Sequence, residues 1–201
     1  MQYDILAKWP PCEMLYIVSM RFITESAMRS AEAVTTAIDR ARADFSYTDP
    51  EPTLNHLQNI LAMGAALSRY FWPVRAGHEN RGKILRRSFN VTDSSPLKSR
   101  DVRNEIEHFD EKLDIYLSKG VVGVIVAHYV GPSPKSSQVP SHFFRAYYTD
   151  RDVFEVLGKR FTIQPLVAEI ARIHILLGES QRSGGRLPGK CSGGKLPRAQ
   201  R

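Results

Sequence analysis

Apolar residues recur at intervals of three and four positions in four stretches of the chain, the spacing of one face of an α-helix. The first stretch follows "WPPCE" (9–13) and ends before "YTDPEP" (47–52), where two prolines cannot continue a helix. The second runs from about Pro52 to Trp72, the third from Pro96 to Gly120, and the fourth begins at Pro165. The pattern therefore predicts four helices.

The apolar faces of these helices define the expected core. They comprise Leu15, Val18 and Phe22, then Val34, Ile38, Ala41 and Phe45, in the first helix; Leu54, Leu57, Leu61, Gly64 and Phe71 in the second; Val102, Ile106, Phe109, Leu113 and Leu117 in the third; and Leu166, Ile170, Ile173 and Leu177 in the fourth.

The helical spacing of apolar residues ends after the third predicted helix. "VVGVIVAHYV" (121–130) is rich in β-branched residues and is typical of an extended segment, and "GPSPKSSQVP" (131–140) is typical of a loop. Residues 143–163 predict a hairpin that turns at "TDRD" (149–152). The expected fold is mainly α: a four-helix bundle over residues 1–178 with a small β-hairpin insertion, at about 121–163, between the third and fourth helices.

The net charge of +7 comes largely from the C-terminal end. Residues 181–201 contain six Lys or Arg and no Asp or Glu, so the rest of the chain is nearly neutral. Glycine is frequent there and large apolar residues are few, so residues 179–201 are predicted to be a disordered basic tail. Such a tail acts as a spacer or binds nucleic-acid phosphates non-specifically.

Several classes of protein are not supported by the sequence. The two cysteines, at positions 12 and 191, form neither a disulfide framework nor a zinc pattern. No paired metal-ligand spacing and no cofactor motif is present, so neither a metal nor a cofactor is expected. The N-terminus lacks the basic start of a signal peptide, and the longest apolar run is too short to span a membrane. We expect a cytoplasmic location and no membrane partner.

One polar stretch, "DVRNEIEHFDEKLDIYL" (101–117), contains candidate catalytic residues. An imidazole titrates near neutrality and can act as a general acid or base, so His108 is a candidate for that role. On a continuous helix Asn104 lies on the same face as His108, away from the apolar stripe. The alternative is a solvated helix face on which Arg103 pairs with Glu107 or Asp110.

The spacing Arg103-Asn104-x-x-x-His108 resembles the motif of the HEPN superfamily, whose members are helical bundles. Many of these proteins are metal-independent endoribonucleases that act as dimers, and others bind RNA or proteins without catalysis. The resemblance implies that Arg103 holds the scissile phosphate, that Asn104 orients the imidazole or the substrate, and that His108 transfers a proton.

A basic connector supplies the remaining candidates. The expected RNA-binding residues are Arg75, Arg81, Lys83, Arg86, Arg87 and Arg100. The leading hypothesis is an HEPN-like homodimer that binds or cleaves RNA, and the sequence leaves the identity of any protein partner open. The alternative hypothesis is a non-catalytic helical module for interaction or dimerisation.

Overall fold

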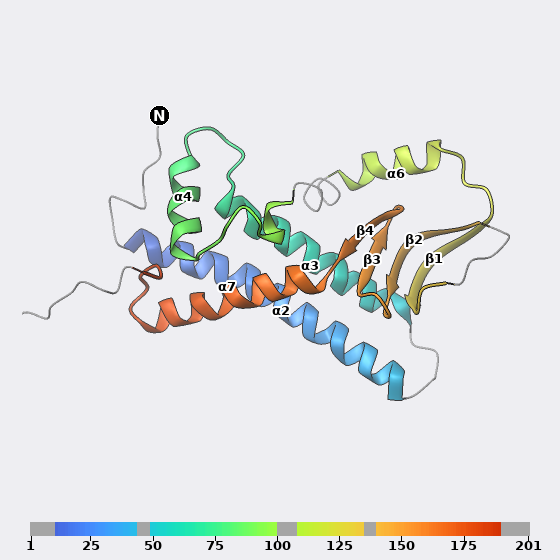
Figure 1. Ribbon diagram of the computed structural model, residues 1–201, viewed down its shortest axis with the longest axis horizontal. Helices are drawn as coiled ribbons and strands as arrows, with labels where there is room; N and C mark the ends of the chain where they lie inside the picture. Colours follow the sequence, from blue (N-terminus) through green and yellow to red (C-terminus); the bar gives the residue numbers. More distant parts are fainter. Residues whose placement is uncertain (1–10, 44–48, 100–107, 135–139, 190–201) are drawn as a thin grey trace, which may run out of the picture.

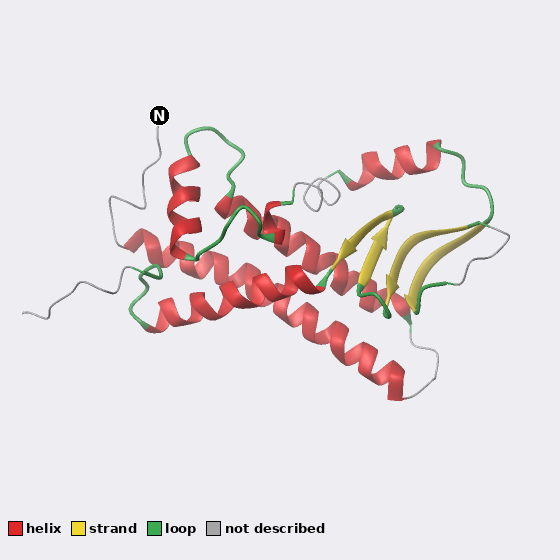
Figure 2. Ribbon diagram, in the orientation of Figure 1, coloured by secondary structure: helices red, strands yellow, loops and turns green. Residues whose placement is uncertain are grey.

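The structure is a computed structural model that describes residues 11–43, 49–99, 108–134 and 140–189 (Figure 1). Within these ranges the strands lie together at one end of the helices (Figure 2). In chain order the elements are α2 (Pro11–Ala43), α3 (Pro50–Phe71), α4 (Glu79–Ser88), the short 3-10 helix η1 (Pro96–Lys98), α6 (Phe109–Ser118), β1 (Val124–Gly131), β2 (Ser141–Tyr148), β3 (Val153–Val156), β4 (Lys159–Thr162) and α7 (Gln164–Arg182).

The predicted fold class, a four-helix HEPN-like bundle with a small hairpin insertion, is wrong. The described residues form five α-helices and a four-stranded mixed sheet of order β1-β2-β3-β4. β1 pairs with β2 in parallel, whereas the β2–β3 and β3–β4 pairs are antiparallel. Hydrophobic periodicity indicates which segments are extended but not which of them pair, so it does not reveal the size of the sheet.

A second turn accounts for part of the difference. The predicted turn at 149–152 is present between β2 and β3. The chain then turns again at Leu157 and Gly158, whose φ angles are +49° and +76°. Positive φ at both central residues is the signature of a type I′ turn, which suits the twist of a two-stranded hairpin. This turn creates β4 within a segment that the sequence pattern assigns to one strand.

Helices α2, α3 and α7 pack on one another and contain most of the helical core. The Asp49 carboxylate caps the start of α3 by accepting a hydrogen bond from the Glu51 backbone N–H at 3.0 Å. The apolar faces predicted for the second and fourth helices are confirmed as buried: Leu54, Leu57, Leu61, Gly64 and Phe71 in α3, and Leu166, Ile170, Ile173 and Leu177 in α7.

The first predicted face of α2 is not part of this core. Leu15, Val18 and Phe22 are 68%, 44% and 75% exposed, while Ile17 and Met20 on the opposite side are fully buried. Both sides of this part of the helix are apolar, so the spacing of apolar residues does not determine which side packs inward.

The third predicted helix is not continuous. Its predicted start is partly right, since the Ser95 hydroxyl accepts a hydrogen bond from the Leu97 N–H at 3.4 Å, but only the short helix η1 follows. Helix α6 begins later, at Phe109, and no residue in it is fully buried. It packs on the sheet through its half-buried apolar residues, and the rings of Phe109 and Phe144 lie 6.0 Å apart. Residues 100–107, with the predicted core positions Val102 and Ile106, lie outside the described residues.

The C-terminal part of the fold extends beyond the predicted boundary at 178. Helix α7 continues to Arg182, and the Leu187 side chain is fully buried. The buried carboxylate of Glu13, at the start of α2, accepts hydrogen bonds from the Leu187 N–H at 2.8 Å and from Arg186 Nε at 3.2 Å. Residues 183–189 are therefore attached to α2, and residues 190–201 lie outside the described part.

The sheet and the helices share one hydrophobic core. Tyr147, Phe154 and Phe161 belong to the same buried cluster as the core residues of α2, α3 and α7. A smaller cluster comprises Phe143, Ala146 and Tyr148 with the half-buried residues Val126, Tyr129 and Val153. The sheet is thus part of the main folding unit.

Candidate functional site

The structure places only one residue of the predicted catalytic motif. Arg103 and Asn104 lie outside the described residues, and so does Arg100 of the predicted RNA-binding set. His108 precedes α6, with φ of −121° and ψ of 41°, so its predicted position inside a helix is wrong. Its side chain is 52% exposed, and Nδ1 lies 3.6 Å from Glu111 Oε2. The ribonuclease hypothesis remains a prediction.

Two arginines of the predicted basic connector have structural contacts. Arg81 Nη2 donates a hydrogen bond to the Arg69 carbonyl at 2.9 Å, and Arg86 Nη1 donates to the Phe71 carbonyl. Both carbonyls belong to the last turn of α3, where unpaired carbonyl oxygens carry partial negative charge. The guanidinium groups also stack near aromatic rings, Arg81 near Tyr70 and Arg86 near Trp72.

The other described members of the predicted RNA-binding set are exposed. They are Arg75, Lys83 and Arg87. Their solvent accessibility is compatible with either solvation or RNA binding, so their predicted role also remains a prediction.

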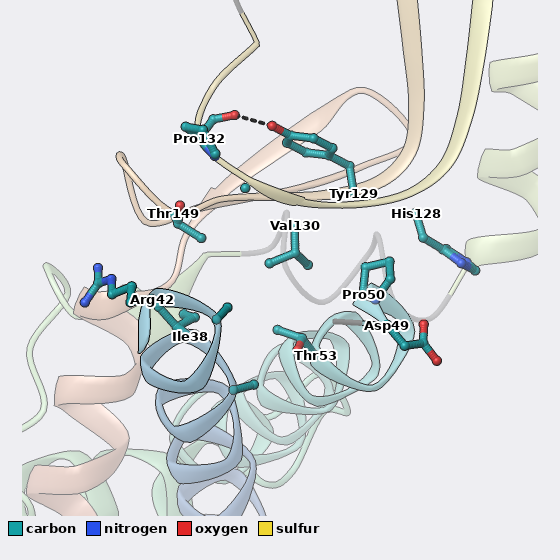
Figure 3. Close-up of a pocket in the computed structure, with 13 residues that line it drawn as sticks. Ile38, Arg42, Asp49, Pro50, Thr53, His128, Tyr129, Val130, Pro132 and Thr149 are labelled. Carbon is teal, nitrogen blue, oxygen red and sulfur yellow. Dashed lines mark hydrogen bonds between the residues drawn. The ribbon is translucent and has the colours of Figure 1, made fainter. Parts of the chain in front are cut away.

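A pocket of about 470 Å³ lies between the C-terminal part of α2, the first turn of α3 and the end of β1 (Figure 3). Figure 3 shows Ile38 and Thr53 on one side of this space and Val130 facing them from the strand above. The lining residues are Ala37, Ile38, Ala41, Arg42, Asp49, Pro50, Thr53, His128, Tyr129, Val130, Gly131, Pro132 and Thr149. The interior is mainly apolar, and the charged groups lie at its edges.

Polar side chains define the edges of the pocket. In Figure 3, Arg42 lies on one side, and Asp49 and His128 lie on the other. The Tyr129 hydroxyl donates a hydrogen bond to the Pro132 carbonyl at 2.6 Å. Burial, reinforced by the negative charge of Asp150, raises the pKa of Tyr129, so this phenol stays neutral at physiological pH. Tyr129 therefore holds the end of β1 in place without adding charge.

A buried arginine lies next to the pocket. Arg145, on β2, is only 9% exposed, and its Nη1 donates to Asn55 Oδ1 at 2.7 Å and to Gln58 Oε1 at 3.2 Å. Its Nη2 lies 2.9 Å from His128 Nε2. Because a guanidinium can only donate, this ring nitrogen accepts the hydrogen bond, and a neutral His128 carries its proton on Nδ1. His128 thus contacts Arg145 and also lines the pocket.

Sequence reasoning did not identify these polar residues, although one signal was available. Arg145 is the only charged residue in "FFRAYY" (143–148), and His128 is the only ionisable group other than a tyrosine in "VVGVIVAHYV". A single cation within an apolar strand indicates that the charge is either buried or at an edge. Its partners Asn55 and Gln58 come from α3, about ninety positions earlier, and no local pattern connects them.

Other kinds of site find little support in the described part of the chain. It contains no group of three His, Cys, Asp or Glu side chains placed to hold a metal ion. None of its helices combines the length and the apolar character required to cross a membrane.

His174 on α7 predicts a pH dependence of stability. Its Nδ1 lies 2.9 Å from Thr24 Oγ1, which itself donates to the Arg21 carbonyl, so the imidazole donates here. Burial first, and then the positive charge of Arg21, lower the pKa of His174 from its ordinary 6.5, although Glu25 opposes this shift. The unfolded chain therefore takes up this proton at a higher pH than the folded chain does.

The contribution of His174 to stability is expected to be fully present above about pH 6.5 and lost as the pH falls toward the lower folded pKa. Urea unfolding at about pH 7.5 and 5.0 measures this loss, because the linkage relation ties it to proton uptake. The His174→Gln variant keeps a donor for Thr24 but does not titrate, so it should lose less stability on acidification than the wild type. Equal losses in the two proteins would contradict the prediction.

Comparisons with models of protein families, with curated proteins and with solved structures gave no match for this chain. The functional conclusion therefore depends on the geometry of the pocket and its neighbouring polar groups.

Proposed function

We propose that the protein binds a small molecule in the pocket between α2, α3 and β1. The observation that carries this proposal is the pocket of about 470 Å³, which falls in the usual range for small-molecule sites of about 300–1,000 Å³. Its apolar interior and few polar groups at the edge are the composition expected of such a site. The ligand accordingly has an apolar body.

The arrangement supports binding more strongly than acid–base catalysis. His128 is the only imidazole that lines the pocket, and its Nε2 already accepts a hydrogen bond from Arg145. The Tyr129 hydroxyl donates to a backbone carbonyl. The groups best suited to proton transfer are thus engaged in contacts within the protein.

The proposal predicts saturable binding of an apolar probe, 1-octanol, observed as chemical-shift changes at Ala37, Ile38 and Val130 in NMR titrations. The Ala41→Trp substitution places an indole in the pocket and should weaken this binding by at least about tenfold, equivalent to about 1.4 kcal/mol. Arg40→Trp is the matched control, because Arg40 is an exposed residue of the same helix that does not line the pocket.

Two results would contradict the proposal. One is the absence of saturable shifts in the wild-type protein. The other is equal 1-octanol affinity in the Ala41→Trp variant and the wild type, which would place the probe elsewhere on the surface.

A further inference from the structure

Arg145 differs from the other buried charged residues. Three charged side chains are buried in the described part of the chain, at Glu13, Arg145 and Glu155. Glu13 pairs with Arg186 at 3.2 Å, and Glu155 pairs with Arg160 at 2.7 Å. Arg145 has no carboxylate within ion-pair distance among the described residues, and its three hydrogen-bond partners are uncharged when His128 is neutral. A buried cation without a counter-charge is unfavourable, so an anion would stabilise it.

The unused donors of Arg145 specify the shape of that anion. A guanidinium has five N–H donors, and Asn55, Gln58 and His128 occupy three of them. The Nε atom is buried without a hydrogen-bond partner. The remaining donors are the Nε–H and one Nη2–H, and the nitrogens Nε and Nη2 share one edge of the planar group. Two neighbouring donors of this kind match the two oxygens of a carboxylate.

His128 connects these donors to the pocket. Its imidazole contacts Arg145 and is half-buried, and the same residue lines the pocket. Rotation of this side chain would expose the guanidinium to a ligand whose apolar body lies against Ile38 and Val130. The net charge selects among anions: one cation balances a singly charged carboxylate, whereas a doubly charged phosphate would leave excess buried negative charge.

We infer that the pocket takes an amphipathic monocarboxylate, with its apolar body between α2 and β1 and its carboxylate on the free Nε–H and Nη2–H donors of Arg145. This inference rests on the proposed function and adds the chemical class of the ligand.

Calorimetric titrations of octanoate and 1-octanol, run side by side at about pH 7.5, test the inference. The two probes have equal chain lengths and differ at one end, which is a carboxylate in octanoate and a neutral hydroxyl in 1-octanol. Octanoate is expected to bind the wild-type protein at least about tenfold more tightly, because hydrogen bonds to charged groups are the strong ones. Arg145→Met should abolish this preference, and Arg145→Lys should retain part of it.

A second measurement requires no variant. Octanoate should shift the Arg145 Nε–Hε resonance of the wild-type protein downfield, as a new charge-assisted hydrogen bond does, and 1-octanol should not. Equal affinities for the two probes, or an unshifted Nε–Hε resonance at saturating octanoate, would overturn the carboxylate inference and leave the proposed function standing. Failure of both probes to bind would remove the proposed function as well.

Discussion

Removal of residues 183–201 is expected to lower the free energy of unfolding by about 3–5 kcal/mol, because it takes two hydrogen-bond donors from a buried carboxylate and removes a buried leucine. The truncation removes the Leu187 N–H and the Arg186 guanidinium, both of which donate to Glu13. The Glu13 carboxylate is almost completely buried, so water would not readily replace these two donors. The fully buried Leu187 side chain is lost in the same step, which adds a cavity or exposes core surface.

Truncation after Gly189 is the matched control. It removes only residues outside the described part and keeps the contacts of Arg186 and Leu187 with Glu13. Urea unfolding of the two shortened proteins beside the full chain measures the difference. If both truncations left the free energy of unfolding unchanged, the contact between Glu13 and the C-terminal segment would not contribute to stability.

The Phe154→Ala variant should lose about 3–5 kcal/mol, the usual cost of truncating a buried aromatic residue. Phe154 lies on β3, is fully buried, and belongs to the same core cluster as residues of α2, α3 and α7. For a chain of this length the corresponding decrease in melting temperature is about 6–20 °C. The helices should be destabilised together with the sheet, because the two share this core.

Far-ultraviolet circular dichroism and near-ultraviolet tyrosine signals, recorded on one sample, test whether helices and sheet unfold in a single transition. Phe22→Ala is the matched control: it makes the same chemical change at a position that is 75% exposed, and it should alter stability by no more than about 0.5 kcal/mol. A helical signal that keeps its wild-type midpoint in Phe154→Ala would show that the sheet unfolds independently.

The two helices whose predicted core face is buried throughout, α3 and α7, each have a single apolar stripe. Helix α3 has one such stripe, from Leu54 to Phe71, with a proline at its start, and all its predicted core positions are buried. Helix α2 carries apolar residues on opposite sides in its first turns, so its exposed side was mistaken for core. The spacing of residues describes one helix at a time and contains no information on which neighbour covers it.

The sheet and the pocket depend on contacts between distant parts of the chain. The pairing of Val126 with Phe143, and of Phe154 with Phe161, fixes the sheet, and neither pair is visible in the alternation of one strand. The pocket needs three segments, represented by Ile38, Thr53 and Val130. Ionisable residues are frequent in the charged stretch 101–117, whereas the buried cation Arg145 lies in an apolar strand, where the sequence pattern does not indicate a site.

The packing of α2 against α7 has a consequence for the order in which the chain can fold during synthesis. The contact between Thr24 and His174 spans 150 positions. At about 5–20 residues per second, a ribosome takes roughly 8–30 s to make the intervening chain. During that interval the α7-facing side of α2 is not covered by α7, and α2 emerges before the other helices of the described residues. A chaperone that binds apolar helices would therefore find its target in α2, and release would follow completion of the C-terminal segment.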